Sequence, residues 1–237
     1  VLPNYINLDI WDGSKPPAEK PSDPFVIGWF GTATHDEDLA IIKPTIVKLA
    51  RKYAGKVIFK FWGYLPKDLE GIPGVQLVRG SQPDLRLHAR DLVNCRIDLA
   101  LAPLLDHPFN HAKSDLKWLE YSICQIPGIY STISPYTASV THGKTGWLVD
   151  NDPAIWADAI EKFISDDTLR RSIATQAYDE VRRTRCVDNG SEQWDALYCS
   201  FVAGGTRPRG ATDESLEAKR HRAAAHIMLF QSEVASN

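Results

Sequence analysis

One segment of the chain, residues 109–127, carries a run of polar side chains suited to binding an anion. It follows an apolar stretch typical of a buried strand, and its own second half has apolar residues at helical spacing. Ser114 is expected to begin this helix, because its hydroxyl can accept a hydrogen bond from a free backbone N–H of the first turn. At about 100° per residue, Lys113, Lys117 and Glu120 share a different edge of the helix. Since a helix N-terminus favours negative charge, the segment predicts an anion site at the end of a strand.

The rest of the chain alternates short apolar runs with amphipathic segments. Such alternation predicts an α/β fold, a parallel sheet of about six strands with helices on both faces. Ligands of these sheets bind outside the carboxyl ends of the strands, so the loops that follow the strands should share one crevice. Strands are expected at residues 25–30, 56–62, 75–78, 97–103, 128–131 and 146–149. Helices are expected at residues 39–51, 85–95 and 114–125, after Asp152, from Asp167, and around residues 194–201.

Local signals mark where some of these helices begin. Thr34 and Glu37 form a candidate capping box after the first strand. Pro44 lies inside the apolar pattern of the next helix, where it should kink the helix or mark its true start. Asp152 followed by Pro153 is a strong start signal, an N-cap with proline at the first helical position.

Composition excludes several classes of function. The chain has 237 residues and a formal net charge of −3, so it offers no basic field for nucleic acid. No apolar run is long enough to span a bilayer, and the first residues lack the features of a signal peptide. The four cysteines fit neither a metal motif nor a dense disulfide framework, so we expect reduced thiols and a cytoplasmic location. The chain does not start with methionine, which suits a fragment of a longer protein.

Composition also divides the chain into three parts. Residues 1–24 are rich in Pro, Asp and Lys and are expected to form an interdomain linker. Residues 25–203 carry the alternating pattern and form the predicted domain. Residues 204–237 begin with a stretch rich in glycine, which indicates another linker, and continue with a segment that could be either a helix or a solvated tail.

Three stretches resemble a known family, in the order in which that family has them. They are IGWFGTATHDEDL, then IDLALAPLLDHPFNHAKSDLKWLEYSICQIPGIYS, then HGKTGWLV. They resemble the carboxyl-terminal, donor-binding half of GT-B glycosyltransferases, and most of all the retaining glycosyltransferase family 4. The resemblance covers residues 1–201 and counts PNYINLDIW as the linker that joins the two halves of those enzymes. It implies a doubly wound, Rossmann-like domain that binds a nucleotide sugar.

The resemblance also implies roles for individual residues. Glu120 matches the glutamate that holds the nucleotide ribose, and its carboxylate can accept from two hydroxyls. Lys113 and Ser114 match the place of the diphosphate, where Lys113 and His35 would assist departure of the nucleoside diphosphate. Neither a metal nor a cofactor is expected, and the donor would be a UDP- or GDP-linked sugar. The implied donor-binding residues are Gly31, Thr32, Arg79, Asn110, Lys113, Ser114 and Glu120.

Two departures from the family pattern concern the donor sugar and the diphosphate. Ala112 stands where the family has an earlier glutamate that contacts the sugar, so Asp106, Asn110 or Lys113 would have to take over those contacts. The arginine and lysine that commonly bind diphosphate after the first strand are also missing from this sequence. The candidate substitutes are His35, Lys113 and Lys117.

The amino-terminal half of a GT-B enzyme, which binds the acceptor, lies outside the stretches that carry the resemblance. We therefore expect the chain alone to bind the donor without transferring the sugar. The acceptor would be a glycan, a lipid-linked sugar or a polysaccharide held by the missing half. Through that half, the enzyme could associate peripherally with a membrane.

Each of these residues also has a plainer interpretation. Glu120 could pair with Lys113 or Lys117 on an exposed helix face, and His35 could be an ordinary first-turn residue. A second hypothesis is a catalytically degenerate module of the same fold, motivated by Ala112, that binds nucleotide sugars or acts as a scaffold. A third, a dinucleotide- or ATP-binding enzyme, is disfavoured because the chain lacks Gly-x-Gly-x-x-Gly and a P-loop.

Overall fold

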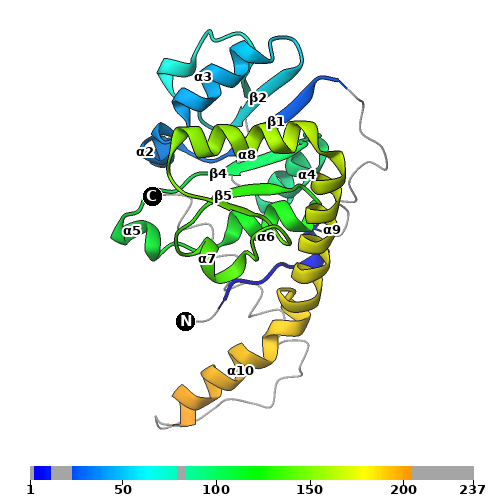
Figure 1. Ribbon diagram of the computed structural model, residues 1–237. Coiled ribbons are helices and arrows are strands. Elements are labelled where there is room, and N and C mark those ends of the chain that lie inside the picture. The colour runs from blue at the N-terminus through cyan, green and yellow to red at the C-terminus, as the bar shows by residue number, and fades with distance from the viewer. Residues whose placement is uncertain (1–2, 12–22, 79–83, 204–237) are drawn as a thin grey trace.

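The structure is a computed structural model that describes residues 3–11, 23–78 and 84–203. Within these ranges the chain forms one six-stranded sheet in which neighbouring strands are parallel (Figure 1). The strand order is β3-β2-β1-β4-β5-β6, which confirms the predicted parallel sheet. The strands are β1 Phe25–Phe30, β2 Val57–Trp62, β3 Val75–Val78, β4 Leu99–Ala102, β5 Gly128–Ser131 and β6 Trp147–Val149.

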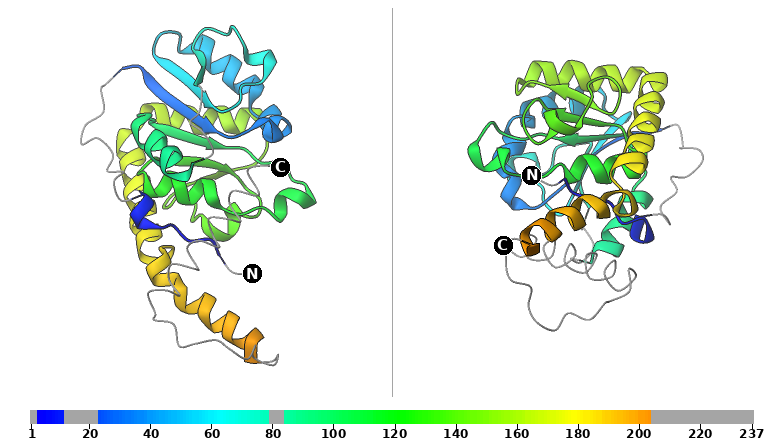
Figure 2. Two further views of the ribbon diagram at one scale, coloured as in Figure 1. Left: turned by 180° about the vertical axis from the view of Figure 1, so that it is seen from behind. Right: turned by 90° about the horizontal axis from the view of Figure 1, so that it is seen from below.

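Helices cover both faces of this sheet (Figures 1 and 2). The described residues contain no helix with the length and apolar character needed to cross a membrane. The helices are α1 Leu8–Trp11, α2 Asp36–Ala40, α3 Lys43–Lys52, α4 Leu85–Asn94, α5 Pro108–His111, α6 Leu116–Ile123, α7 Tyr136–Ser139, α8 Pro153–Ser165, α9 Asp167–Thr184 and α10 Val187–Ala203, with 3-10 turns at Ala33–His35 and Lys67–Leu69.

The central strand β1 is buried on both faces, which explains why its sequence reads as a continuous apolar run. Alternate side chains of a strand point to opposite faces. Ile27 and Trp29 therefore join one core cluster, with residues of α3, α8 and α9, while Val26 and Phe30 join the other, with residues of α4 and α6. The two clusters hold the sheet between two layers of helices.

The strand order reverses between β1 and β4, the topological switch point of the sheet. Chain connections leave β1 and β4 toward opposite sides there, and ligands of doubly wound sheets bind at the carboxyl ends of these strands. In this protein the two loops at that edge are residues 31–35, which lead into α2, and residues 103–107, which lead into α5.

Three helix starts can be compared with the expectations. Asp152 caps α8 by accepting from two backbone N–H groups of its first turn, as expected. Pro44 lies in the first turn of α3, so it marks the start of that helix. The prediction of a capping box at Thr34 and Glu37 is wrong. Thr34 lies inside a 3-10 turn, and its hydroxyl is hydrogen-bonded to that of Thr32.

Ser114 is not the N-cap of α6, which corrects the expectation drawn from its residue type. The helix begins at Leu116, and the N-cap position belongs to Asp115, whose side chain makes no capping hydrogen bond. Its buried carboxylate instead accepts from Arg185 and from the hydroxyl of Ser139. Long-range contacts of Asp115 therefore decide where this helix starts.

Part of the amino-terminal segment, expected to be a linker, packs against the domain. Residue Ile6 bridges Cys186, with its N–H donating to Arg185 and its carbonyl accepting from Val187. Short helix α1 follows and buries Trp11 beside α4. Residues 3–11 thus belong structurally to the same body as the sheet.

Candidate functional site

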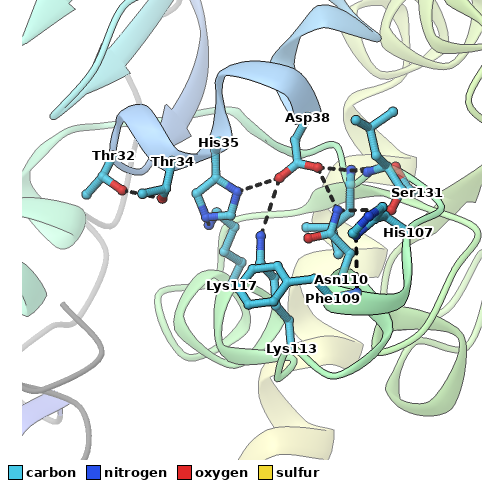
Figure 3. Close-up of polar contacts among 12 residues, drawn as sticks. Thr32, Thr34, His35, Asp38, His107, Phe109, Asn110, Lys113, Lys117 and Ser131 are labelled. Carbon is cyan, nitrogen blue, oxygen red and sulfur yellow. Dashed lines mark hydrogen bonds and ion pairs between the residues drawn. The ribbon is translucent and has the colours of Figure 1, made fainter. Parts of the chain in front are cut away.

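Asp38 lies at the centre of the switch point and was missed by the sequence reasoning. It stands in α2 after the first strand, and only 4% of it is exposed. Its Oδ1 accepts from the backbone N–H of Leu105 and from Nδ2 of Asn110, both at 2.8 Å. Its Oδ2 accepts from Nδ1 of His35 at 2.7 Å and lies 3.5 Å from Nζ of Lys113 (Figure 3). One carboxylate thus joins the loops that follow β1 and β4.

These contacts keep Asp38 ionised. Burial acts to raise its pKa, but the hydrogen bonds from His35 and Leu105 and the charge of Lys113 outweigh burial. Together they lower the pKa of Asp38 to about 2. The site therefore holds a fixed negative charge surrounded by donors.

His35 lies between this carboxylate and a second lysine. Its Nδ1 faces Asp38, and its Nε2 is 3.4 Å from Nζ of Lys117 (Figure 3). The imidazole also meets the buried ring of Trp29 edge-on, with ring centroids 6.1 Å apart. Burial, together with the charges of Lys117 and Lys113, lowers the pKa of His35 despite its bond to Asp38. The lowered pKa favours the neutral form of the ring.

Two lysines complete this cluster. The side chain of Lys113 is 22% exposed, and its ammonium lies over the ring of Phe109 with 5.2 Å to the centroid. Burial lowers the pKa of Lys117 to about 8, with the charge of Lys113 acting in the same direction and Glu120 and Asp38 opposing it. Two cations held so close together, beside a neutral imidazole, favour the approach of an anion.

Asn110 has a clear part in holding the loop after β4. It is buried, and its Nδ2 donates both to Asp38 and to the carbonyl of Leu105 at 3.0 Å. The same loop is tied to β5, because Ser131 accepts from the N–H of Leu104. Both hydrogen bonds of the Asn110 side-chain nitrogen are therefore made within the protein.

The remaining predicted residues near this edge differ in their surroundings. Gly31 directly follows β1, and a Cβ there would lie 2.5 Å from the ring of Trp29, so its small size is required by the fold itself. Thr32 and Ser114 are exposed, and their predicted donor contacts stay untested. Arg79 lies outside the described residues, and its prediction stays untested.

Glu120 lies on α6 and has found a partner that the sequence reasoning did not name. Its Oε2 is 3.4 Å from Nε2 of His88 on α4, and the Glu120 side chain is 16% exposed. The His88 ring sits edge-on to Trp11 and Phe30, with centroids 6.1 and 6.0 Å away. The helix that carries His88 was predicted from the sequence. A histidine on the inner side of that helix was the signal that could have indicated a buried partner for Glu120.

This pair makes stability depend on pH. Burial alone would lower the pKa of His88, but the charge of Glu120 and its hydrogen bond raise that pKa above the ordinary 6.5. A raised folded-state pKa stabilises the protein fully below pH 6.5, and the gain is lost as pH rises through the folded value.

We therefore expect Glu120→Gln to lower the free energy of unfolding by about 1 kcal/mol at acidic pH and by less in alkaline buffer. Urea unfolding at a series of pH values measures this difference. In a His88→Gln background the pH dependence of the Glu120→Gln effect should become smaller, leaving the part that comes from Lys117, whose pKa Glu120 also acts to raise. An effect of equal size across the whole series would contradict the pairing.

The structure thus brings His35, Asn110 and Lys113 together with Lys117 around Asp38, while Glu120 lies one turn further along α6 with His88. Among the described residues, no group of His, Cys, Asp and Glu side chains is arranged to hold a metal ion. Chemically, the cluster at the switch point can bind an anionic group and stabilise negative charge that develops on it.

The fold is that of one Rossmann-like half of a GT-B glycosyltransferase, as comparison with solved structures shows. Sucrose-phosphate synthase from Thermosynechococcus elongatus matches with a TM-score of 0.65 and 19% identity, over 86% of this chain and 53% of that one. HepE from Anabaena, solved with UDP-glucose, matches with a TM-score of 0.63 and 16% identity, over 84% and 57%. The carboxyl-terminal domain of the glycosyl transferase group 1 protein LpcC from Francisella tularensis matches with a TM-score of 0.54 and 20% identity, over 78% and 95%.

Sequence comparison points the same way over a shorter stretch. D-inositol 3-phosphate glycosyltransferase from Corynebacterium urealyticum is 36% identical over 84 residues, which cover 35% of this chain and 20% of that protein. No protein-family model matches the chain. The resemblance to GT-B glycosyltransferases is confirmed, and the chain spans about half the length of sucrose-phosphate synthase.

Proposed function

We propose that this chain is the donor-binding half of a retaining, metal-independent glycosyltransferase of the family 4 type. The observation that carries the proposal is the pair of cations Lys113 and Lys117, gathered with His35 at the switch point of the sheet. A nucleoside diphosphate is the ligand whose charge this cluster fits. A solved relative of the same fold, HepE, holds UDP-glucose, which supports a nucleotide sugar as the donor.

In this proposal the cluster assists the departure of the nucleoside diphosphate. The bond between the anomeric carbon and the phosphate oxygen breaks, and the electron pair stays on that oxygen. Lys113 and Lys117 stabilise the negative charge that develops there, as preorganised cations do. His35 contacts Lys117 directly and is linked to Lys113 through Asp38, which both of them contact. It can therefore help the lysines to stabilise the charge of the leaving group.

The proposal assigns the nucleoside to the neighbouring part of α6. Glu120 would accept hydrogen bonds from the two ribose hydroxyls, because a carboxylate offers several lone pairs. Its contact with His88 would then hold the carboxylate in place for the ribose. Arg79 would contact the base, and Gly31, Thr32 and Ser114 would lie along the phosphates or the sugar.

In this proposal the acceptor is bound by the other, acceptor-binding half of the GT-B enzyme. It would be a glycan, a lipid-linked sugar or a polysaccharide, and this chain alone would bind donor without transferring it. A cytoplasmic location is part of the same proposal, and the four cysteines are free thiols in keeping with it.

Calorimetry with UDP and with GDP tests the proposed site. Wild-type protein should bind at least one of them, and Glu120→Ala should weaken binding about tenfold through the loss of hydrogen bonds to a charged group. Glu161→Ala is the matched control, since Glu161 is a carboxylate of α8 that pairs with Lys52. No binding by the wild type, or equal binding by Glu120→Ala, would show that the assignment is wrong.

A catalytically degenerate binding module is a second candidate, and one observation favours it. Ala112 is exposed at the C-cap of α5, where its methyl group offers no hydrogen bond to a sugar hydroxyl. A module would bind UDP and UDP-sugars equally well, because nothing recognises the sugar. A full-length protein with an amino-terminal Rossmann-like half and measurable transfer would exclude this candidate.

A further inference from the structure

Asp38 makes more contacts across the switch point than a stabilising ion pair requires. Its two oxygens serve four donors: one from the residue before α2 and three from the loop after β4, from α5 and from the segment that follows α5. These partners lie 67 to 75 residues away along the chain, apart from His35 at the start of the same helix. Replacing Asp38 would therefore remove contacts to both loops of the proposed donor site.

The contact between Asp38 and His35 determines where the imidazole carries its proton. An ionised carboxylate can only accept, so Nδ1 of His35 must be the donor across their 2.7 Å contact. In a neutral ring the other nitrogen, Nε2, then carries a lone pair. That lone pair faces Nζ of Lys117, which is a donor, at 3.4 Å. From Asp38 through His35 to Lys117, each hydrogen-bond donor thus faces an acceptor.

We propose that Asp38 is the positioning residue of the donor site, holding His35 as the Nδ1–H tautomer with Nε2 toward Lys117 and keeping Lys113 beside it for the diphosphate. This inference rests on the proposed function and deepens it. Asp38 itself is buried behind His35 and Lys113, so it acts through them and does not touch the donor.

The arrangement lets His35 respond to the charge of a bound diphosphate. The charged groups that face the ring are Asp38 from α2, Lys117 from α6 and Lys113 from the segment between α5 and α6. Without a ligand, burial and the charges of the two lysines lower the pKa of the imidazole and so favour its neutral form. A diphosphate offsets the lysines, so Nε2 can take one proton from solvent, and Asp38 stabilises the imidazolium that forms.

Asp38→Asn tests this arrangement because it preserves size while removing the charge. The Asn oxygen can still accept from Leu105 and Asn110, and its NH₂ group then faces Nδ1 of His35. Nδ1 must become the acceptor, and the proton moves to Nε2, where it opposes the ammonium of Lys117. We expect the tautomer of His35 to change and the cation cluster to be disturbed.

Asp98→Asn is the matched control at the other edge of the sheet. Asp98 precedes β4 and accepts from the N–H of Val26 in β1 at 2.7 Å, so it links the same two strands at their amino ends. Its replacement also removes a carboxylate that binds a backbone N–H. It should leave the tautomer of His35 and the affinity for UDP unchanged.

Two measurements on the whole chain decide the matter. Nitrogen-15 NMR, with His35→Gln to assign the signal, should show the Nδ1–H tautomer in the wild type and the Nε2–H tautomer in Asp38→Asn. Calorimetry with UDP, in two buffers of different ionisation enthalpy, should show proton uptake by the wild type. Asp38→Asn should lose that uptake and bind UDP at least about tenfold more weakly.

The possible results separate this inference from the proposed function. An Nε2–H tautomer in the wild type overturns the inference without any need for a folded variant. Wild-type affinity for UDP in Asp38→Asn overturns it too, while leaving the proposed function standing. If the wild type binds neither UDP nor GDP, the proposed function and the donor role of Asp38 both fail, and the tautomers then report only how Asp38 holds His35.

Discussion

Replacing Arg185 with methionine is expected to destabilise the protein by about 3–5 kcal/mol, because it leaves a buried carboxylate without its cation. Arg185 donates to both oxygens of Asp115, at 2.9 and 2.8 Å, and the two side chains are only 12% and 7% exposed. The same guanidinium also donates to the carbonyl of Asn4 and lies over the ring of Trp118. Urea unfolding measures the loss.

The pair of Asp115 and Arg185 is also expected to affect nucleotide binding, because of where it lies. Asp115 stands directly before α6, the helix that carries Lys117 and Glu120. An unpaired carboxylate at that point would move toward solvent and pull the start of the helix with it. We expect the destabilisation to be accompanied by weaker nucleotide binding under conditions where the variant is still folded.

A double-mutant cycle separates the pair from the packing of the arginine stem. Asp115→Asn keeps a partner for the hydroxyl of Ser139 while removing the charge. Combined with Arg185→Met, it should cost clearly less than the sum of the two single changes, since neither charge is then left buried alone. Purely additive losses would mean that the ion pair contributes little and that packing on Trp118 dominates.

The sheet could be predicted from sequence because its central strands β1, β4 and β5 are buried on both faces. Residues 25–30 form a short apolar run and residues 128–131 a short run rich in apolar residues, and the structure places a strand at each. Their parallel arrangement followed from the helices between them. What the pattern leaves open is the order of the strands, which depends on how distant helices pack.

The centre of the site could not be predicted in the same way. Asp38 stands among acidic residues in the sequence THDED, and nothing in that stretch distinguishes it from Asp36 or Glu37. Its importance comes from Leu105, Asn110 and Lys113, which are 67 to 75 residues further along the chain. Contacts at such separations depend on the strand order, so spacing rules for a single helix do not reveal them.

Local rules also failed where distant partners compete for the same side chain. Ser114 has the residue type of an N-cap, but the N-cap position of α6 lies one residue later, at Asp115, whose carboxylate is paired with Arg185. Glu120 was considered a partner of Lys113 or Lys117, and it contacts His88 of another helix. In each case, tertiary contacts outweigh the preference of an isolated helix.

Lys113→Ala is expected to weaken UDP binding by about 10- to 150-fold, the effect of removing a hydrogen bond between charged groups. Its ammonium contacts Asp38 at 3.5 Å, long for a charge-assisted bond, and part of the side chain faces solvent. It can therefore turn to a phosphate without giving up a strong contact. Its loss also leaves the negative charge of Asp38 less compensated, which repels a diphosphate.

Ligands and a control variant separate this charge effect from damage to the fold. Uridine has no phosphate, so it should bind the wild type and Lys113→Ala alike. Lys113→Arg should recover part of the affinity for UDP, because it restores the charge but not the compact ammonium. Lys52→Ala removes an exposed lysine of α3 that pairs with Glu161, and it should leave UDP binding unchanged. Equal loss of uridine and UDP affinity in Lys113→Ala would contradict a diphosphate site at Lys113 and indicate a general disturbance of the loop after β4.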